Sequence, residues 1–229
     1  MTYNKLSDDA ADQATEAFPS YRSTSTRAPS IAPVVIPATP GELSEPVFGH
    51  NNITENDSDL TSQHNAAPLG ERIIVSGRLL DERARPVVGS LIEIWQSNAA
   101  GRYIHADDQH DAPLDPNFTG AGRVLTDADG WYRFITVKPG AYPWANHTNA
   151  WRPAHIHFSL FGYSFLSRLI TQMYFPADPL LRLDPILQSV TDATQRARLV
   201  ASLDLSLTKP GWALGYRFDV VLRGTKSTP

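Results

Sequence analysis

The sequence contains no cysteine, and this absence excludes several classes of protein at once. A disulfide scaffold, a zinc finger, a cysteine-ligated iron–sulfur cluster and a thiol nucleophile all require cysteine. An excess of positive charge is also missing, because 20 Lys and Arg residues are set against 24 Asp and Glu residues and the formal net charge is −4. The composition therefore does not favour binding to nucleic acid or to an anionic membrane.

Long apolar runs are missing as well. The longest one near the N-terminus, residues 31–36, is interrupted by Pro33 and is far too short to span a bilayer. The first ten residues are polar and include Asp8 and Asp9, which does not fit a secretory signal, so we expect a cytoplasmic protein. Hydrophobic residues still make up 41% of the 229 positions, which is enough to bury the core of one globular domain.

Proline is abundant, and its distribution divides the chain. Prolines recur between Phe18 and Phe48 and forbid helix there, so this segment is predicted to be an extended arm. Residues 51–67 are polar and predict a surface loop. We therefore predict an arm and loop over residues 1–69 that contacts another subunit, followed by a β-sandwich catalytic domain over residues 70–229.

From residue 71 onward, short segments rich in β-branched and aromatic residues alternate with turns, which is typical of strands. In residues 91–95 the odd positions fall on one face, and Ile92 and Ile94 fall on the other. Strands are predicted at residues 72–80, 91–95, 123–126, 131–137, 154–160, 169–175 and 216–222.

Turn and cap signals complete the prediction of the fold. The segments 123–126 and 131–137, joined by an Asp- and Gly-rich turn, are typical of a β-hairpin. One helix is predicted from about Thr191 to Leu203, with Thr191 or Asp192 as its N-cap. The fold class is predicted to be mainly β: an antiparallel β-sandwich with long loops, an extended N-terminal arm and one or two short helices.

His155 and His157 lie two residues apart in a predicted strand. Their side chains therefore point to the same face, roughly 6.5–7 Å apart along the chain, and both imidazoles can converge on one ion. In a chain without cysteine, His, Tyr and carboxylates are the strong ligands that remain. Half-buried histidines on a strand also often serve only as hydrogen-bonding groups, so the spacing alone leaves both interpretations open.

Three further candidates lie near this pair. Arg152 precedes His155 by three residues, Tyr142 lies in a proline-bracketed loop, and Tyr103 follows the predicted strand at 91–95. On the residues alone, each tyrosine is more typical of packing or hydrogen bonding, and Arg152 is also explained by an ion pair. Three tryptophans are interpreted as core residues: Trp95, Trp131 and Trp151.

Seven segments, in one order along the chain, carry a family resemblance. They are Gly77–Asp81, Ile94–Tyr103, Leu114–Phe118, Lys138–Trp144, Trp151–Phe158, Ile170–Phe175 and Tyr216–Gly224. Together they resemble the intradiol ring-cleavage dioxygenases, and the resemblance covers nearly the whole chain from Tyr21 onward. Its most specific parts are Tyr-Pro-Trp at 142–144 and Arg-Pro-Ala-His-Ile-His at 152–157.

The resemblance implies a metal site and a reaction. It implies a mononuclear non-haem Fe(III) ion held by Tyr103, Tyr142, His155 and His157, and phenolates are hard anionic donors that suit ferric ion. The family cleaves a catechol ring with O2 between its two hydroxyl-bearing carbons. By the same resemblance Tyr142 can accept a substrate proton.

The resemblance also implies roles around the ring. Arg152 would stabilise developing negative charge, and Gln172 would be a polar residue behind the site. The remaining substrate-binding positions are Tyr21, Trp144, Ala145 and Ile186.

A partner and a substrate follow from the family as well. The members most similar to this chain pair with a homologous α chain that lacks the iron ligands, so this chain is expected to be the iron-carrying one in an αβ protomer and a higher oligomer. The expected reaction converts protocatechuate to 3-carboxy-cis,cis-muconate in the degradation of aromatic compounds (the β-ketoadipate pathway). Members specific for protocatechuate tend to have Arg where this chain has Ala145, which leaves another catechol such as 4-sulfocatechol open.

Two other interpretations compete. Catechol and hydroxyquinol 1,2-dioxygenases resemble the chain around the ligands, but they carry a long helical N-terminal region that the proline-rich arm does not match. A non-catalytic transthyretin-like binding module is suggested by residues 77–92, although such a module needs no tyrosines beside a His-x-His pair.

Overall fold

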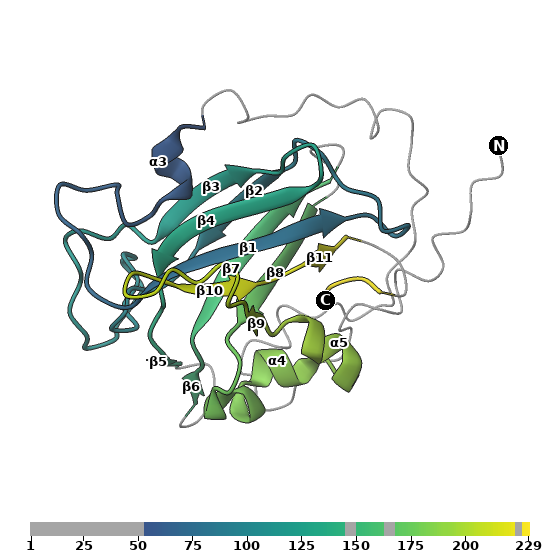
Figure 1. Cartoon of the computed structure of the whole chain (residues 1–229). Coiled ribbons are helices and arrows are strands. Elements are labelled where there is room, and N and C mark those ends of the chain that lie inside the picture. Colours follow the sequence, from purple (N-terminus) through teal and green to yellow (C-terminus); the bar gives the residue numbers. More distant parts are fainter. Residues whose placement is uncertain (1–52, 145–149, 163–167, 223–225) are drawn as a thin grey trace.

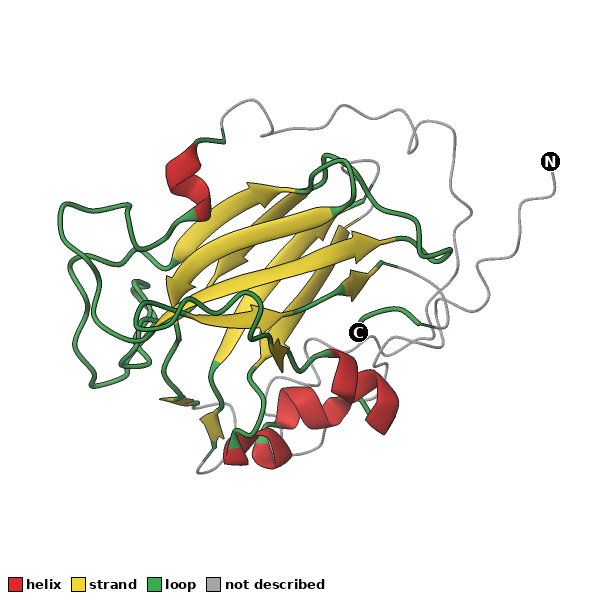
Figure 2. Ribbon diagram, viewed as in Figure 1, coloured by secondary structure: helices red, strands yellow, loops and turns green. Residues whose placement is uncertain are grey.

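The computed structural model describes residues 53–144, 150–162, 168–222 and 226–229, and in it two β-sheets pack face to face with helices at their margins (Figures 1 and 2). The strands are β1 Arg72–Leu80, β2 Leu91–Trp95, β3 Ala121–Leu125, β4 Trp131–Val137, β5 Tyr142–Pro143, β6 Trp151–Arg152, β7 His155–Phe161, β8 Arg168–Tyr174, β9 Ser202–Leu203, β10 Leu214–Arg217 and β11 Val220–Val221. The helices are α3 Glu55–Ser58, the 3-10 helix η3 Pro179–Leu183, α4 Pro185–Ser189 and α5 Ala193–Arg198. The predicted mainly β sandwich is confirmed.

The two sheets differ in how their strands pair. In one sheet the order is β3-β2-β7-β8, and every pair is antiparallel. In the other sheet β1 is central, with β4 antiparallel on one side and β10 and β11 parallel on the other. The second sheet is therefore mixed, whereas the sequence predicted only antiparallel pairing.

Six of the predicted strands lie within two residues of their expected bounds, but the predicted hairpin is wrong. The strand β3 pairs with β2, and β4 pairs with β1, so the two strands belong to different sheets. The turn between them is tight, with the Gly130 N–H donating to the Asp127 carbonyl at 3.0 Å. The turn therefore carries the chain from one sheet to the other. The sequence does not predict this, because the period of two in a strand fixes which face is buried and leaves open which strand it pairs with.

Three other expectations need correction. The predicted strand at 216–222 is divided into β10 and β11, since between them the Asp219 carboxylate accepts the Arg78 N–H at 2.8 Å. The predicted helix begins as expected after Asp192, which caps it, but it ends at Arg198. The loop expected at 51–67 contains α3 and also Leu60, which is fully buried in the core.

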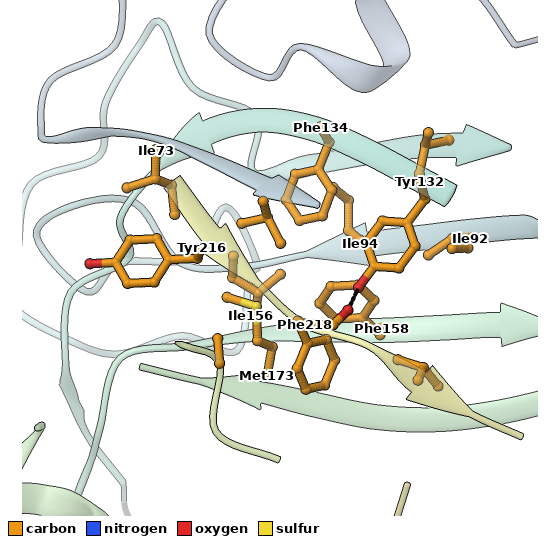
Figure 3. Packing of buried hydrophobic residues seen from close by; sticks show 14 of the residues in the cluster. Ile73, Ile92, Ile94, Tyr132, Phe134, Ile156, Phe158, Met173, Tyr216 and Phe218 are labelled. Atoms are coloured by element: carbon orange, nitrogen blue, oxygen red, sulfur yellow. Dashed lines mark hydrogen bonds between the residues drawn. The ribbon is translucent and has the colours of Figure 1, made fainter. Parts of the chain in front are cut away.

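Apolar side chains from both sheets form the core, seen from close by in Figure 3. Ile92 and Ile94 point into it, as their spacing predicts. At its centre the Phe158 ring contacts the rings of Tyr132 and Phe134, with centroids 6.0 and 5.9 Å away. This packing holds one face of β7 against the opposite sheet and so fixes the register of that strand.

A close backbone approach between β1 and the C-terminal segment requires glycine. A Cβ atom added at Gly77 would meet the Phe218 carbonyl oxygen at 1.7 Å. The same carbonyl accepts a hydrogen bond from the buried Tyr132 hydroxyl, drawn as a dashed line in Figure 3. Gly77 therefore lets Phe218 reach the core while its polar backbone remains satisfied.

The helices are short and local. The turn η3 packs against β6, and Asp184 joins η3 to α4 at the end of the sandwich where β5 and β6 lie (Figure 1). Within the described ranges, every helix falls short of the length and apolar character needed to cross a membrane. Their importance lies in the side chains that they bring to the site below.

Candidate active site

Two tyrosines and two histidines converge at this end of the molecule. His155 and His157 share one face of β7, with ring centroids 4.9 Å apart. Tyr142 is placed by the β5–β6 ribbon, and its ring centroid is 5.5 Å from that of His155. Tyr103, on the loop after β2, contacts Tyr142 edge to face at 5.4 Å. The four residues expected as ligands therefore lie side by side.

The loop that carries Tyr103 is held by its own polar side chains. The Asn98 side-chain oxygen accepts the N–H groups of Ala100 and Arg102, both at 2.9 Å. The Asp108 carboxylate accepts the Tyr103 N–H at 2.7 Å. These bonds orient the tyrosine toward the cluster although no regular element extends to it.

The hydrogen bonds of His155 define its tautomer. Its Nδ1 lies 2.7 Å from the Pro153 carbonyl oxygen, which only accepts, so Nδ1 carries the proton and Nε2 carries the lone pair. Burial lowers the pKa of His155 well below its ordinary value, and the nearby charge of Arg152 lowers it further. The ring is thus neutral. Its Nε2 lone pair can bind a metal ion, and this nitrogen lies 3.3 Å from the Tyr142 hydroxyl.

His157 is also neutral and is fixed by stacking. Burial, followed by the charge of Arg152, lowers its pKa to about 3. The Trp95 ring lies parallel to the imidazole, with centroids 4.8 Å apart and an interplanar angle of 3°. Trp95 was interpreted as a core residue, yet it lies on the site face of β2 and supports a candidate ligand.

The two phenols are partly buried in a way that suits a cation. Among the described residues, no hydrogen bond of ordinary geometry reaches the buried Tyr103 hydroxyl, which lies next to the Tyr142 phenol. Burial raises the pKa of both tyrosines, and for Tyr103 the neighbouring Tyr142 raises it further. Without a cation both remain neutral, and a metal ion would supply the charge needed to ionise them.

This donor set fits a hard, highly charged metal ion. Phenolate oxygens are hard anionic ligands, and neutral imidazoles complete a mixed oxygen and nitrogen set. In the part of the chain that the structure describes, no three His, Asp or Glu side chains gather into a metal-binding group. A site built on His155 and His157 would therefore depend on the two tyrosines.

Arg152 is the hub behind the cluster. Its side chain is only 3% exposed, and its Nε and Nη2 donate to the two carboxylate oxygens of Asp184 at 3.1 and 2.9 Å. The Gln172 side-chain oxygen accepts from Nη2 at 2.6 Å, and Nη1 faces His155 Nε2 at 3.2 Å. Burial acts to lower the pKa of Arg152, but neighbouring Tyr174 and Asp184 raise it overall, so the guanidinium stays charged.

The other predicted substrate-binding residues are only partly described. The Trp144 ring lies 5.4 Å from the Arg152 Cζ atom, and Ile186 follows Asp184 within α4. Tyr21 and Ala145 lie outside the described residues. Two of the tryptophans expected in the core are surface residues: Trp131 is 37% exposed and Trp151 is 47% exposed.

Sequence reasoning missed two residues of the cluster. Asp184 and Tyr174 both contact the guanidinium, at 2.9 and 3.0 Å from Nη2. Asp184 lies 32 positions from Arg152 along the chain, so local spacing carries no signal of the pair. A weak signal existed for Tyr174, because it lies two positions after Gln172 on the same strand and so shares its face.

An open hollow of about 440 Å³ lies beside this cluster and does not contain it. The hollow is lined by residues of β2 and β3 together with Asp57, and Trp95 is its link to the cluster. Its charged groups include Asp57 and Arg123, which form an ion pair at 2.8 Å. Because Arg123 in the hollow is already paired with Asp57, the hollow is a weaker candidate for an active site than the tyrosine–histidine cluster.

All of the similar proteins described next are dioxygenases. A family model described as "Dioxygenase" matches residues 43–224. The chain is 57% identical over 213 residues to the protocatechuate 3,4-dioxygenase beta chain of Burkholderia cepacia, covering 92% of this chain and 90% of that protein. It is 32% identical over 168 residues to the alpha chain from the same organism, covering 69% of this chain and 76% of that one.

A solved structure agrees with the sequence relatives. The dioxygenase domain of a dioxygenase carbohydrate-binding protein fusion from Streptomyces sp. SirexAA-E superimposes with a TM-score of 0.52 at 25% identity. The match covers 78% of this chain and 96% of that domain. The β-sandwich of this chain therefore resembles that of a solved dioxygenase domain.

Proposed function

This chain belongs to the intradiol ring-cleavage dioxygenase family, and from that premise we propose that it cleaves protocatechuate to 3-carboxy-cis,cis-muconate with O2. The bond broken is the one between the two hydroxyl-bearing carbons. The similarity to a protocatechuate 3,4-dioxygenase beta chain, over nine-tenths of both sequences, supports this substrate. The single observation that carries the proposal is the convergence of two tyrosines and two neutral histidines.

The cofactor in this proposal is one mononuclear non-haem Fe(III) ion. It would be held by Tyr103, Tyr142, His155 and His157, whose donor chemistry fits it as described above. When bound, a ferric ion supplies Lewis acidity that favours the catecholate over the catechol and withdraws electron density from the ring.

The residues of the chain would accept a proton from the substrate, stabilise its charge and form the walls of its binding space. As the phenolate that a bound cation would stabilise, Tyr142 would take up one catechol proton at its oxygen, which lies 3.3 Å from His155 Nε2. Arg152 would place its permanent positive charge beside the ring and stabilise negative charge that develops there. Gln172 would hold the guanidinium, and Trp144 and Ile186 would form walls of the ring-binding space.

Partner and domain assignments extend the proposal. A homologous α chain would complete the pocket in an αβ protomer and a higher oligomer, which is supported by relatives named as alpha and beta chains. Residues 1–69, with Tyr21 near the site, would contact the partner, and residues 70–229 would form the catalytic domain. The assembly would act in the cytoplasm on catechols derived from aromatic compounds.

The test is product analysis on the iron-loaded enzyme, expressed together with its homologous partner chain. We expect stoichiometric iron, uptake of O2 equimolar with protocatechuate, and 3-carboxy-cis,cis-muconate as the product. A protein that binds no stoichiometric iron with its partner present contradicts the proposal. So does a product cleaved outside the two hydroxyl-bearing carbons.

Ala145 leaves a second candidate substrate open. Relatives specific for protocatechuate tend to have a cation at this position, and without it the choice of para-substituent would rest on other residues, so another catechol such as 4-sulfocatechol is the second candidate. Relative turnover of protocatechuate, catechol and 4-sulfocatechol by the wild type and Ala145→Arg separates the two candidates. Identical profiles for the two proteins would show that this position does not select the substituent.

A further inference from the structure

Asp184 lies at the junction of η3 and α4 and is fully buried. Its backbone serves the two helices, since its N–H donates to the Leu180 carbonyl at 3.0 Å and its carbonyl accepts the Gln188 N–H at 2.9 Å. Its carboxylate takes no part in capping α4 and is directed to Arg152. We propose that Asp184 is a positioning residue that aims Arg152 at the bound catechol, an inference that rests on the proposed function.

The hydrogen bonds define the direction of the guanidinium. The Asp184 carboxylate occupies the Nε and Nη2 edge of Arg152 with two bonds, which fixes the plane of the fork. Nη1 is then the end turned toward the cluster, 3.2 Å from His155 Nε2. A single bond would leave the group free to rotate about its axis, whereas the paired contact does not.

Two residues of β8 support the carboxylate and the guanidinium together. The buried Tyr174 hydroxyl donates to Asp184 Oδ2 at 2.8 Å and lies 3.0 Å from Arg152 Nη2. Gln172 accepts from the same Nη2. In the sheet, Tyr174 and Gln172 are the register partners of His155 and His157, so one pair of strands carries both candidate histidine ligands and two of the residues that contact Arg152.

The 3-10 helix η3 also contacts the backbone next to Arg152, through Asp178. At the start of η3, Asp178 accepts the Leu180 N–H at 2.9 Å and the Ala154 N–H at 3.3 Å. Asp178 therefore holds the chain between Arg152 and His155, while Asp184 holds the guanidinium. This gives a matched control, because the two carboxylates lie at opposite ends of one turn and only Asp184 contacts the cation.

A purely structural role is the competing explanation, because buried ion pairs often hold folded segments together. The two explanations differ in what a second substitution does. If Asp184 acts through Arg152, its effect on turnover disappears once the guanidinium is removed. If it only stabilises the fold, its effect on turnover is the same with or without Arg152.

The experiment compares Asp184→Asn, Arg152→Gln and the double variant in the iron-loaded enzyme with its partner chain. We expect Asp184→Asn to lower kcat by about 10²-fold, the loss typical of a catalytic group misplaced by about 1 Å, with a smaller change in KM and full iron content. In the Arg152→Gln background the same substitution should cause no further loss. Calorimetric titration with protocatechuate under anaerobic conditions measures binding apart from turnover, and there Asp184→Asn should shift the affinity far less than kcat.

Two more variants keep the inference testable if Asp184→Asn folds poorly. Tyr174→Phe removes only the hydroxyl that supports Asp184 and should lower kcat by about 10-fold, again without effect in the Arg152→Gln background. Asp178→Asn should lower the unfolding temperature. Its fold-loss in kcat should be the same in the wild type and in the Arg152→Gln background.

Several results would overturn the inference. Wild-type kcat in Asp184→Asn would do so, and so would equal losses with and without Arg152. If the wild type itself cleaves no catechol, the proposed function fails and the inference fails with it. If the wild type is active but Asp184→Asn and Arg152→Gln lower kcat independently, the positioning role of Asp184 fails and the proposed function stands.

Discussion

On one face of β7, Ile156, Phe158 and Leu160 are fully buried among the apolar side chains of the core. On the opposite face, His155 and His157 lie among tyrosines, with an arginine behind them. The two faces are separated by the thickness of one strand. His155 is also buried, at 1% exposed, and His157 is partly buried, but the chemistry of the two faces differs completely.

The difference shows what each region needs from its residues. The core is held by apolar area removed from water, which depends on volume and little on direction. The cluster is held by directed bonds, in which His155 presents one defined nitrogen and Arg152 one defined edge. We therefore expect substitutions on the core face to change the free energy of unfolding, and substitutions on the site face to change iron binding and activity.

The largest expected effect is the loss of chemistry on the site face. His157→Ala should abolish stoichiometric iron binding and, with it, ring cleavage, because one of the four proposed ligands is removed. The matched control is His105→Ala, on an exposed loop where the side chain is 67% exposed. Iron analysis and O2 uptake measure both variants, and full iron in His157→Ala would show that the ligand set is wrong.

The neighbouring residue on the core face should behave in the opposite way. Phe158→Ala should lower the free energy of unfolding by about 3–5 kcal/mol, because a large ring is removed from a packed core and a cavity remains. Ile170→Ala on the next strand is the control, since Ile170 is 59% exposed and should change stability by less than about 0.5 kcal/mol. Urea unfolding of the iron-free proteins measures both, and similar values for the two variants would break the comparison.

A polar contact inside the core gives a smaller effect. Tyr132→Phe removes the hydroxyl that donates to the Phe218 carbonyl and leaves that carbonyl without its partner. We expect the free energy of unfolding to fall by about 1–3 kcal/mol. Iron content and kcat should remain those of the wild type, and a large loss of either would mean that the core and the site are coupled through this contact.

The smallest effect concerns an ion pair outside both regions. The Ser206 hydroxyl and the Arg217 guanidinium lower the pKa of Asp204 from 3.8 to about 2. Because the folded-state pKa lies below the unfolded value, the stabilisation is complete above about pH 4 and is lost as the pH falls through about 2. Asp204→Asn should therefore be slightly less stable than the wild type at neutral pH, and the difference should shrink toward pH 2. Urea unfolding at a series of pH values measures this, and a constant difference would contradict it.

Much of the sandwich follows from the sequence because its strands are locally encoded. Alternation in residues 91–95 gives the buried face of β2, and similar patterns place β1, β4, β7 and β8. Pairing does not follow, because β3 and β4 are joined by a turn typical of hairpins and still enter different sheets. Which strands pair depends on packing between distant segments, and a local pattern carries no record of it.

The site shows the same division. Spacing and family resemblance together indicate Tyr103, Tyr142, His155 and His157, and these four residues do converge. Part of their support was not predicted: Trp95 was expected in the core, and Asp184 had no assigned role. Ligand types can be recognised from residue identity, whereas the groups that orient them are ordinary residues brought together only by the fold.

We propose above that the two tyrosines and two histidines bind ferric iron, which in turn binds a catecholate. The most direct test is the visible absorption spectrum of the protein purified with its partner chain, before and after anaerobic addition of protocatechuate. We expect a wine-red charge-transfer band from phenolate to iron, which shifts to longer wavelength when the catecholate binds and is weakened in Tyr103→Phe. A colourless protein without stoichiometric iron would contradict it.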